Sequence, residues 1–262
     1  MAQQIFEDKN KTDSKIAIVT GGSRGIGRST VLNLAKKGID SIFTYNSNQA
    51  EAEKVTQLVH EMGHNAVYLQ LDTGNISSFE SFEQSVGKAL TELGAERFDY
   101  LVNNAGISHH NAFASVTEQE MDNVYNVHFK GVFFLTQKLL PLMNDGGRII
   151  NISTCVTRTV SPGSSVYASM KGAVEVMSRC LAQELSPRRI TVNVVAPSAT
   201  ATDFSGGIIR DNPEMNKRVA AGTLLGRVGL PDDIGSMIAS LLSDDNHWVN
   251  GQRIEASGGT VV

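Results

Sequence analysis

Residues 15–38 constrain the fold more than any other part of the sequence. An apolar run without polar alternation, Ile16 to Val19, predicts a strand buried on both faces of a parallel sheet. The segment TGGSRGIG follows at 20–27, and a helical pattern then runs from Arg28 to Lys37 and ends at Gly38. In such a unit, glycines let the backbone approach a pyrophosphate, and the helix N-terminus supplies free N–H groups. An ordinary glycine-rich turn is the alternative interpretation of the loop alone.

Strand and helix patterns alternate over almost all of the remaining chain. Further strands are expected at 41–45, 66–71, 98–102, 148–152, 190–195 and 252–255. Helices are expected at 49–62, 77–93, 118–143, 166–185 and 232–242, with short helical pieces within 198–229. This alternation predicts an α/β fold with a doubly wound parallel sheet of about seven strands and helices on both faces. We expect one domain over 15–262 and a disordered leader over 1–14.

The overall composition argues against several classes of protein. The 262 residues carry a formal net charge of −4, which gives no basic footprint for nucleic acid. No apolar run approaches the roughly 20 residues that span a bilayer, and the polar start of the chain does not resemble a secretion signal. The two cysteines, Cys155 and Cys180, form no disulfide framework and indicate a reducing cytoplasm. These features favour a single-domain enzyme without membrane or nucleic-acid partners.

Tyr167 and Lys171 are the main candidates for acid–base chemistry. They lie four residues apart in a segment expected to be helical, so both side chains share one helix face. A free phenol has a pKa near ~10, and its use at neutral pH needs a shift of about three pKa units, or roughly 4 kcal/mol. We expect the neighbouring ammonium to supply much of this shift by lowering the pKa of Tyr167. The pair alone is a weak signal, and the upstream glycine loop strengthens it.

Several motifs, taken in order, resemble the short-chain dehydrogenase/reductase family. They are Thr-Gly-x-x-x-Gly-x-Gly at 20–27, Asn-Asn-Ala-Gly at 103–106, Tyr-x-x-x-Lys at 167–171, the block 226–234 and the ending 251–259. The resemblance covers nearly all of the chain after residue 14. It implies a single-domain Rossmann fold with a nicotinamide dinucleotide, in the branch that contains carbonyl and ketoacyl reductases. No metal is required by the chemistry that it implies.

The resemblance also assigns catalytic roles. It makes Tyr167 the general acid/base and Lys171 the residue that holds the nicotinamide ribose and lowers the pKa of Tyr167. The family serine that orients the substrate carbonyl corresponds to Thr154, thirteen residues before the tyrosine. Ser153 is expected to point away, because strand side chains alternate between faces, although a slipped register would expose it instead.

A second departure concerns the asparagine that completes a water relay in the family. Its position, two residues before the pair Lys130-Gly131, is occupied by His128. Asn126 lies about 200° around the helix from that position and cannot simply substitute. An imidazole both donates and accepts hydrogen bonds, so His128 is a candidate for the relay. A structural histidine tucked against the helix is the alternative.

The end of the second expected strand indicates NADP(H) in preference to NAD(H). An NAD enzyme of this architecture has Asp or Glu there, whereas this chain has Tyr45, Asn46 and Ser47. No carboxylate repels a 2′-phosphate, and Arg24 is placed to attract one; a solvated arginine is the alternative. The predicted cofactor site comprises Gly21, Ser23, Arg24, Gly25, Ile26, Gly27, Tyr45, Asn46, Ser47, Asp72, Thr73, Asn104, Ala105, Gly106, Tyr167, Lys171, Pro197, Thr200 and Thr202.

Within that site the resemblance implies three finer contacts. Asp72 is expected to bond the adenine, and Thr202 the nicotinamide carboxamide. Ser198 stands where the family usually has a glycine after proline, which bears on the backbone fit near the carboxamide.

Three further groups are candidates for ligands or reactive residues. His60 and His64 satisfy His-Glu-x-x-His, but Gly63 is expected to end the helix first and no third ligand is evident, so no metal site is predicted. The pair His109-His110 borders the substrate mouth in the family, although solvated loop histidines are the simpler interpretation. Cys155 is expected to be a small buried hydrophobic residue, not a reactive thiol.

These inferences predict an NADPH-dependent carbonyl reductase that acts on a small-molecule ketone or aldehyde, reversibly. Residues 198–229 are expected to form a mobile substrate cover whose apolar residues favour an apolar substrate. By the resemblance, apolar faces of helices 118–143 and 166–185 imply a homotetramer, with a dimer as the alternative. The rival hypotheses are a cofactor-binding member with lost activity and a regulatory or structural role, and an epimerase or dehydratase.

Overall fold

The computed structural model describes residues 14–159 and 161–260, so the predicted leader, apart from Ser14, lies outside the described residues. One sheet contains the strands β1 (Ile16–Val19), β2 (Asp40–Tyr45), β3 (Ala66–Gln70), β4 (Phe98–Asn103), β5 (Met143–Ile152), β6 (Thr191–Pro197) and β7 (Arg253–Ala256). The α-helices are α1 (Gly25–Ala35), α2 (Gln49–Glu61), α3 (Phe79–Glu92), α4 (Glu118–Tyr125), α5 (Gly131–Leu139), α6 (Ser165–Glu184), α7 (Ile208–Asp211), α8 (Pro213–Ala221) and α9 (Pro231–Leu241). A π-helical turn, η3 (Asn126–Lys130), joins α4 to α5.

Short 3-10 turns complete the secondary structure. They are η1 (Ile76–Ser78), η2 (Phe113–Ser115), η4 (Leu140–Leu142), η5 (Cys155–Thr157), η6 (Ser186–Arg188), η7 (Phe204–Gly207) and η8 (Asp244–Asn246). Two of them matter for the site, because η5 follows the end of β5 and η7 follows the end of β6.

The sheet has the strand order β3-β2-β1-β4-β5-β6-β7, and all of these neighbouring strands are parallel. Chain order reverses between β1 and β4, so the connections after these two strands leave the sheet in opposite directions. Ligands of open α/β sheets bind at such a switch point, at the carboxyl ends of the strands. The prediction of a doubly wound, seven-stranded parallel sheet in one domain is confirmed.

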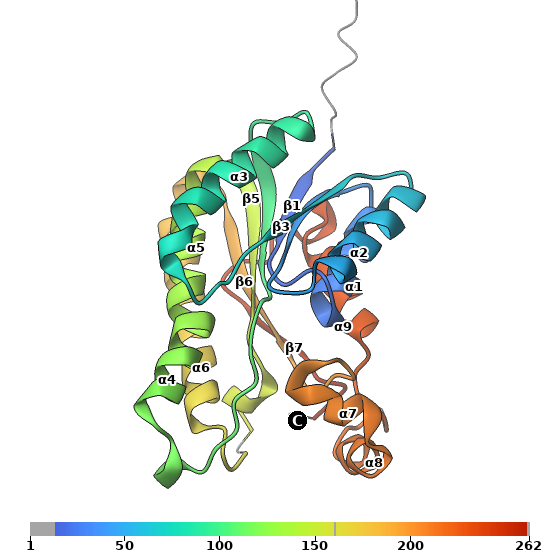
Figure 1. The fold of residues 1–262 in the computed structure, drawn as a ribbon, viewed down its shortest axis with the longest axis vertical. Helices are drawn as coiled ribbons and strands as arrows, with labels where there is room; N and C mark the ends of the chain where they lie inside the picture. Colours follow the sequence, from blue (N-terminus) through green and yellow to red (C-terminus); the bar gives the residue numbers. More distant parts are fainter. Residues whose placement is uncertain (1–13, 160, 261–262) are drawn as a thin grey trace, which may run out of the picture.

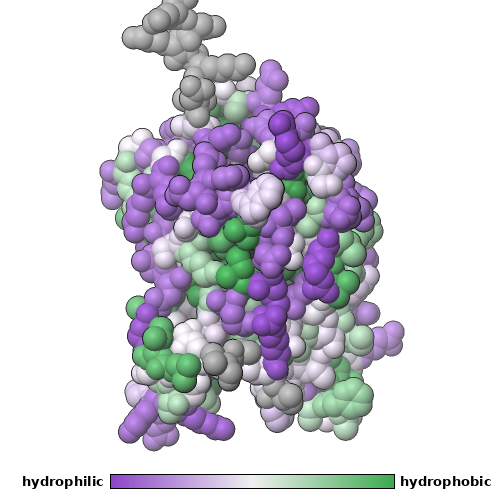
Figure 2. All heavy atoms as spheres, turned by 180° about the vertical axis from the view of Figure 1, so that it is seen from behind, coloured by the Kyte–Doolittle hydropathy of each residue, from purple (hydrophilic) through white to green (hydrophobic). Residues whose placement is uncertain are grey.

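Two helical layers cover the sheet. In Figure 1, α1, α2 and α9 lie on one side of the strands and α3, α4, α5 and α6 on the other. The short helices α7 and α8 stand apart at the lower end of the view, beyond the carboxyl ends of the strands. Seen from behind, hydrophobic surface gathers at this end on two lobes separated by a notch (Figure 2).

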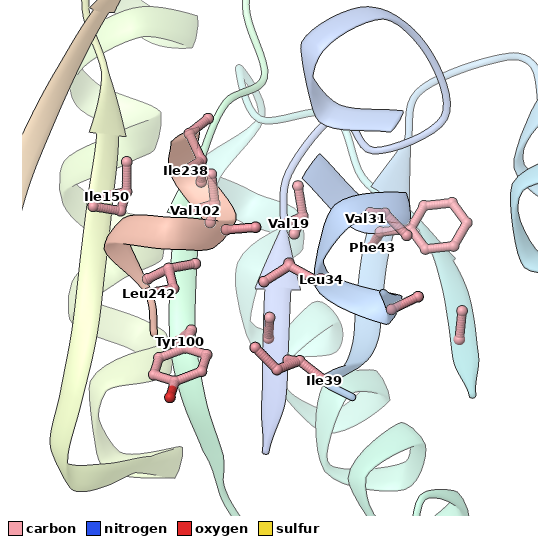
Figure 3. Packing of buried hydrophobic residues seen from close by; sticks show 14 of the residues in the cluster. Val19, Val31, Leu34, Ile39, Phe43, Tyr100, Val102, Ile150, Ile238 and Leu242 are labelled. Atoms are coloured by element: carbon pink, nitrogen blue, oxygen red, sulfur yellow. The ribbon is translucent and has the colours of Figure 1, made fainter. Parts of the chain in front are cut away.

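The core on the α1 side forms because these helices are apolar where they meet the sheet. Val31 and Leu34 of α1 and Ile238 of α9 are fully buried and belong to one cluster with Val19 and Val102 of the central strands. Figure 3 shows these side chains converging from both helices onto β1 and β4. A second cluster, on the α3 and α5 side, contains Phe82, Leu135 and Ile149. The sheet is therefore buried on both faces, as its continuous apolar strands predict.

The predicted helix over 118–143 is wrong as a single element. It is interrupted by η3, α5 ends at Leu139, and β5 begins at Met143, five residues earlier than predicted. Close packing accompanies the interruption: a Cβ on Gly131 would lie 2.0 Å from the Thr73 carbonyl oxygen. Met143 joins the sheet by pairing with Phe98 across a register shift in β4.

The segment 198–229, predicted as a substrate cover, folds into η7, α7 and α8 with irregular connections. Three successive residues, Ser205, Gly206 and Gly207, have positive φ angles of 56°, 69° and 77°. Among the described residues, no helix is both long and apolar enough to cross a bilayer. In the same ranges, no group of three or more His, Cys, Asp or Glu side chains is arranged to hold a metal ion.

Candidate active site

The glycine loop after β1 is fixed from two sides. On one side the Thr44 hydroxyl at the end of β2 accepts a hydrogen bond from the Gly21 N–H at 2.9 Å. On the other, the Thr20 hydroxyl accepts from the N–H groups of Asn104 (2.9 Å) and Ala105 (3.0 Å). The Asn104 side-chain amide donates to the Thr20 carbonyl at 2.9 Å. The predicted loop and the Asn-Asn-Ala-Gly segment are therefore one rigid unit across the switch point.

The glycines in this loop are required by its geometry. A Cβ on Gly27 would lie 2.1 Å from the Gly21 carbonyl oxygen, and Gly21 and Gly25 have φ angles of 66° and 56°. Ser23 is buried, and the Arg24 side chain is exposed at the N-cap of α1. No side chain caps this helix and its first turn holds no acid, so its N–H groups face outward uncompensated. A pyrophosphate fits such a cradle.

The predicted adenosine end lies at the carboxyl ends of β2 and β3. Tyr45 is buried and its hydroxyl contacts Gln49, whereas Asn46 and Ser47 are exposed. Asp72 is exposed, and its carboxylate accepts from the Gly74 N–H at 2.9 Å, which shapes the turn. Thr73 is buried against the π turn.

The predicted nicotinamide end follows β6. Pro197 closes the strand, and the Ser198 hydroxyl donates to the Ser257 carbonyl at 3.1 Å, so the unusual serine ties two loops together. Thr200 forms an isolated bridge with Gly229. Thr202 is buried, and its methyl group would lie 3.4 Å from a Cβ on Gly25, which places it beside the glycine loop.

Thr154 lies beside Tyr167, as the alternation of β5 predicts. A hydrogen bond with the Thr154 side chain is one of the influences on the Tyr167 hydroxyl. Ser153, the alternative, is buried and donates its hydroxyl to Glu175 at 2.6 Å. The structure thus engages Ser153 with a carboxylate and leaves Thr154 as the hydroxyl at the tyrosine.

Tyr167 and Lys171 both come from α6, one turn apart. The Lys171 ammonium lies 5.9 Å from the centroid of the Tyr167 ring and donates to the Ile152 carbonyl oxygen at 2.7 Å. Burial lowers the pKa of Lys171 from 10.5 to about 8. Desolvation raises the pKa of half-buried Tyr167 above its ordinary value of 10, and the Thr154 hydrogen bond opposes this only in part. The net shift of the Tyr167 pKa is thus upward, so the expected fall toward neutrality is not seen in this structure.

His128 is brought to the same place by the π turn. Its ring meets the Tyr167 ring edge-on with centroids 5.1 Å apart. The imidazole Nε2 lies 2.8 Å from the Ile107 carbonyl oxygen, while Nδ1 is buried without a partner among the described residues. Burial, aided by the Lys171 charge, lowers the pKa of His128 to about 3. The imidazole is therefore neutral at physiological pH, and its packing against Gly106 leaves no room for a Cβ there.

Sequence reasoning missed three contacts of the catalytic cluster. The carbonyls of Ile152 and Ile107 hold Lys171 and His128, and backbone groups carry no residue-type signal. Phe204, an apolar residue of the segment 198–229 that was not predicted to reach the tyrosine, has its ring centroid 6.2 Å from that of Tyr167. Its position after the sixth strand was the one available clue.

The other candidate ligands and reactive residues named from the sequence do not take part in this cluster. α2 ends at Glu61 and Gly63 has a φ angle of 81°, so His64 lies outside the helix of His60. His109 lies 3.8 Å from Glu120, with both ring nitrogens buried and without hydrogen-bond partners in the described chain. Cys155 is buried, and burial raises the pKa of its thiol.

Comparisons with known proteins place the chain among relatives of similar sequence and fold. The family described as Enoyl-(Acyl carrier protein) reductase matches residues 21–261. An uncharacterised oxidoreductase of Methylorubrum extorquens is 39% identical over 250 residues, which cover 95% of this chain and 99% of that protein. A hydroxynaphthalene reductase-like protein of Metarhizium brunneum is 34% identical over 259 residues, 95% of each chain. The crystal structure of the angucycline C-6 ketoreductase LanV with bound NADP has a TM-score of 0.90 and 36% identity, and covers 96% of this chain and 97% of that chain.

Fold and site together define a nucleotide-dependent oxidoreductase. The family match and the relatives go further, and the chain belongs to the short-chain dehydrogenase/reductase family. The resemblance inferred from its motifs is thereby confirmed.

Gly27→Ala is expected to weaken NADPH binding by at least roughly tenfold, because the new methyl group collides with the Gly21 carbonyl and displaces the loop. Titration of NADPH fluorescence measures the affinity. Gly87→Ala in α3 is the matched control: nothing lies within 4 Å of its Cβ position, so binding stays at the wild-type value and stability rises by up to about 1 kcal/mol. Equal affinities of the two variants would contradict the role of the loop.

Lys171→Met is expected to change the pH dependence of stability. Between pH 8 and pH 10.5, the two Lys171 pKa values, the unfolded state binds more protons than the folded state. The wild-type free energy of unfolding therefore rises relative to the variant, by about 1.5 kcal/mol from pH 8 to about pH 9.5. Below pH 8 both states are protonated and the two curves run parallel. Urea titrations test this, and parallel curves up to pH 9.5 would refute a buried ammonium.

Proposed function

We propose that this protein reduces a ketone to an alcohol with NADPH, with Tyr167 as the proton donor. The observation that carries the proposal is the cluster of Tyr167, Thr154 and Lys171 at the carboxyl end of β5, together with Phe204 from the segment that also reaches the glycine loop. Bound NADPH supplies the hydride. The cradle of Gly21, Gly25 and Gly27 and the uncapped α1 fit its pyrophosphate.

The chain's own groups handle the proton. Thr154 and Tyr167 hydrogen-bond the carbonyl oxygen of the substrate, and the charge that grows on this oxygen in the transition state strengthens both bonds. The Tyr167 phenol is protonated at neutral pH, and the alkoxide that develops on the substrate is a stronger base than a phenolate, so proton transfer to it is downhill. After proton transfer, the nearby Lys171 ammonium stabilises the phenolate.

His128 is proposed to pass protons to this site. Its unpartnered Nδ1 and its neutral state make it an acceptor for a water molecule, and Nε2 is engaged by Ile107. A hydrogen-bonded water there performs the task that the family assigns to an asparagine side chain. A purely structural histidine leaves Nδ1 buried at a cost of about 1–3 kcal/mol, which favours the relay.

The substrate is proposed to be an apolar aromatic ketone. Phe204 and Ile107 are 42% and 39% exposed and flank the catalytic residues, so they offer apolar contact area to a ligand. The similar proteins support this proposal, since they include a hydroxynaphthalene reductase-like protein and an angucycline ketoreductase. Residues 198–229 are proposed to cover the bound ketone.

The preference for NADPH over NADH is proposed on charge. Arg24 is exposed at the α1 N-cap, and residues 44–48 contain no acid that would repel a 2′-phosphate. The NADP-bound structure of the similar ketoreductase supports this choice.

The oligomeric state and the cellular compartment of the protein are also proposed. Tyr125, Phe133, Phe134 and Val176, on α4, α5 and α6, are 37%, 38%, 40% and 53% exposed, which suits contact with further copies in a homotetramer. The free thiols of Cys155 and Cys180 suit a reducing cytoplasm.

Three alternatives differ from ketone reduction in their product or in their use of the cofactor. The description of the matching family names reduction of an enoyl group, a carbon–carbon double bond. The hydroxyls of Thr154 and Tyr167 are both available to hydrogen-bond the oxygen of a carbonyl group that is being reduced. This arrangement favours ketone reduction. A member with lost activity binds NADPH without consuming it, and an epimerase recycles it. Oxidation of one NADPH for each alcohol formed separates these cases.

Tyr167→Phe is expected to lower kcat by at least ~10³, because the proton donor is lost while the ring packing stays. The assay follows NADPH oxidation with a panel of ketones that carry an aromatic ring, such as 1-tetralone and 2-tetralone. NADPH affinity, measured by fluorescence, should remain near the wild-type value. Turnover close to that of the wild-type protein would rule out the mechanism.

Arg24→Ala is expected to lower kcat/KM for NADPH by about 10- to 100-fold, since a hydrogen bond to a charged group contributes roughly 1.5–3 kcal/mol. The value for NADH should be unchanged. Lys37→Ala, which removes an exposed cation beyond the other end of α1, is the control and should leave both values unchanged. Equal losses with NADH and NADPH would refute recognition of the 2′-phosphate.

A further inference from the structure

An ionic cluster adjoins the segment that carries Thr154, and the proposed mechanism does not use it. Arg253, at the start of β7, pairs with Glu175 of α6 and with Glu255 of its own strand. The side chains of Arg253 and Glu175 are only 8% and 12% exposed. Desolvation offsets much of the attraction in a buried ion pair, so stability alone is weak grounds for its presence. Its further hydrogen bonds indicate another role.

Arg253 holds the backbone of Thr154. Its Nη2 donates to the Thr154 carbonyl oxygen at 3.0 Å and to the Thr157 hydroxyl at 2.9 Å. Its Nε donates to Glu175 at 2.7 Å. One planar guanidinium thus spans the residue at the end of β5, the 3-10 turn that follows it, and helix α6.

Glu175 holds the residues on both sides of Thr154. A single carboxylate oxygen accepts from the Ser153 hydroxyl at 2.6 Å and the Thr157 hydroxyl at 2.8 Å, in addition to Arg253. Desolvation favours the neutral acid, but these three donors together hold the pKa of Glu175 below its usual value. The carboxylate is therefore ionised at neutral pH and keeps all three hydrogen bonds.

The location of Glu175 links this clamp to the catalytic residues. It follows Lys171 by four residues and Tyr167 by eight, so the three side chains lie along one face of α6. The turn that carries Thr154 is fastened to the same face that presents Tyr167. The other hydrogen bonds of the turn are local, such as those from the Val156 N–H to the Thr154 hydroxyl at 3.3 Å and from the Arg158 N–H to the Cys155 carbonyl at 2.9 Å, and they do not fasten it to α6.

We propose that Arg253 and Glu175 are positioning residues that set the Thr154 hydroxyl against Tyr167 by fastening the 153–157 turn to α6. This inference rests on the proposed function. It explains why the buried pair lies at this end of the sheet, because a displacement of about 1 Å in a reacting group lowers a rate by roughly 10²-fold.

Arg253→Lys keeps the positive charge but removes the planar guanidinium, which donates hydrogen bonds to Thr154 and Glu175 at the same time. Its kcat is expected to fall about 10- to 100-fold, with KM for NADPH within about twofold of the wild-type value. Arg148→Lys is the matched control, since that arginine is also 8% exposed and bonds a carboxylate and a carbonyl, those of Asp244 and Leu242. It should lower stability and leave kcat unchanged.

A double-mutant cycle tests whether Arg253 acts through Thr154. In the Thr154→Ala background, Arg253→Lys should lower kcat no further. Glu175→Gln and Thr157→Val, which preserve side-chain size, should lower kcat by about 3- to 30-fold and behave in the same way in that background. They decide the question if Arg253→Lys does not fold.

Unchanged kcat in the folded clamp variants, or an undiminished loss in the Thr154→Ala background, would overturn the positioning role. The proposed function fails separately, if wild-type protein oxidises NADPH with no ketone of the tetralone panel or if Thr154→Ala retains full activity. Either of these results also removes the basis of the inference.

Discussion

The hydrogen bonds between the ends of β1 and β4 are the constraint on which the rest of the site depends. One hydroxyl, that of Thr20, accepts two backbone N–H groups from the neighbouring strand's loop, and Asn104 returns a bond to the Thr20 carbonyl. Neighbouring parallel strands are not connected by a hairpin, so no tight turn fixes the carboxyl ends of β1 and β4 relative to each other. Side-chain hydrogen bonds fix them instead. Because this joint lies at the switch point, it fixes the glycine loop relative to the residues that follow β4 and, through Ile107, relative to His128.

Burial governs the electrostatics of the catalytic cluster. The same exclusion of water makes the lysine less basic, the histidine almost unprotonatable and the tyrosine less acidic. For Tyr167 this effect exceeds the opposing influence of the nearby Thr154 hydroxyl, which lowers the pKa of the phenol.

The strands and most helices could be predicted from the sequence, because particular patterns of residue types mark them. Apolar runs located all seven strands, and the segment that contains Tyr167 and Lys171 is helical, as predicted. The prediction failed over 118–143, since a π turn has no distinctive composition and Met143 enters the sheet through a register shift instead of an apolar run.

The pKa of Tyr167 was also beyond reach from the sequence. Spacing along a helix places an ammonium near a phenol, but it does not give the depth at which both are buried. The backbone carbonyls that hold Lys171 and His128 were invisible for a simpler reason, because every residue has one.

The π turn at 126–130 has a consequence for how this chain can change. It widens one turn of the helix, so α4 and α5 are offset by about 100° from the phase of a regular helix. Deleting a single residue there would regularise the backbone, yet either the His128 ring would swing off Tyr167 or Leu135 and Leu139 would rotate out of the core. Contacts on both sides of the π turn therefore preserve it. Insertions or deletions are far better tolerated in the neighbouring loops than in this helix.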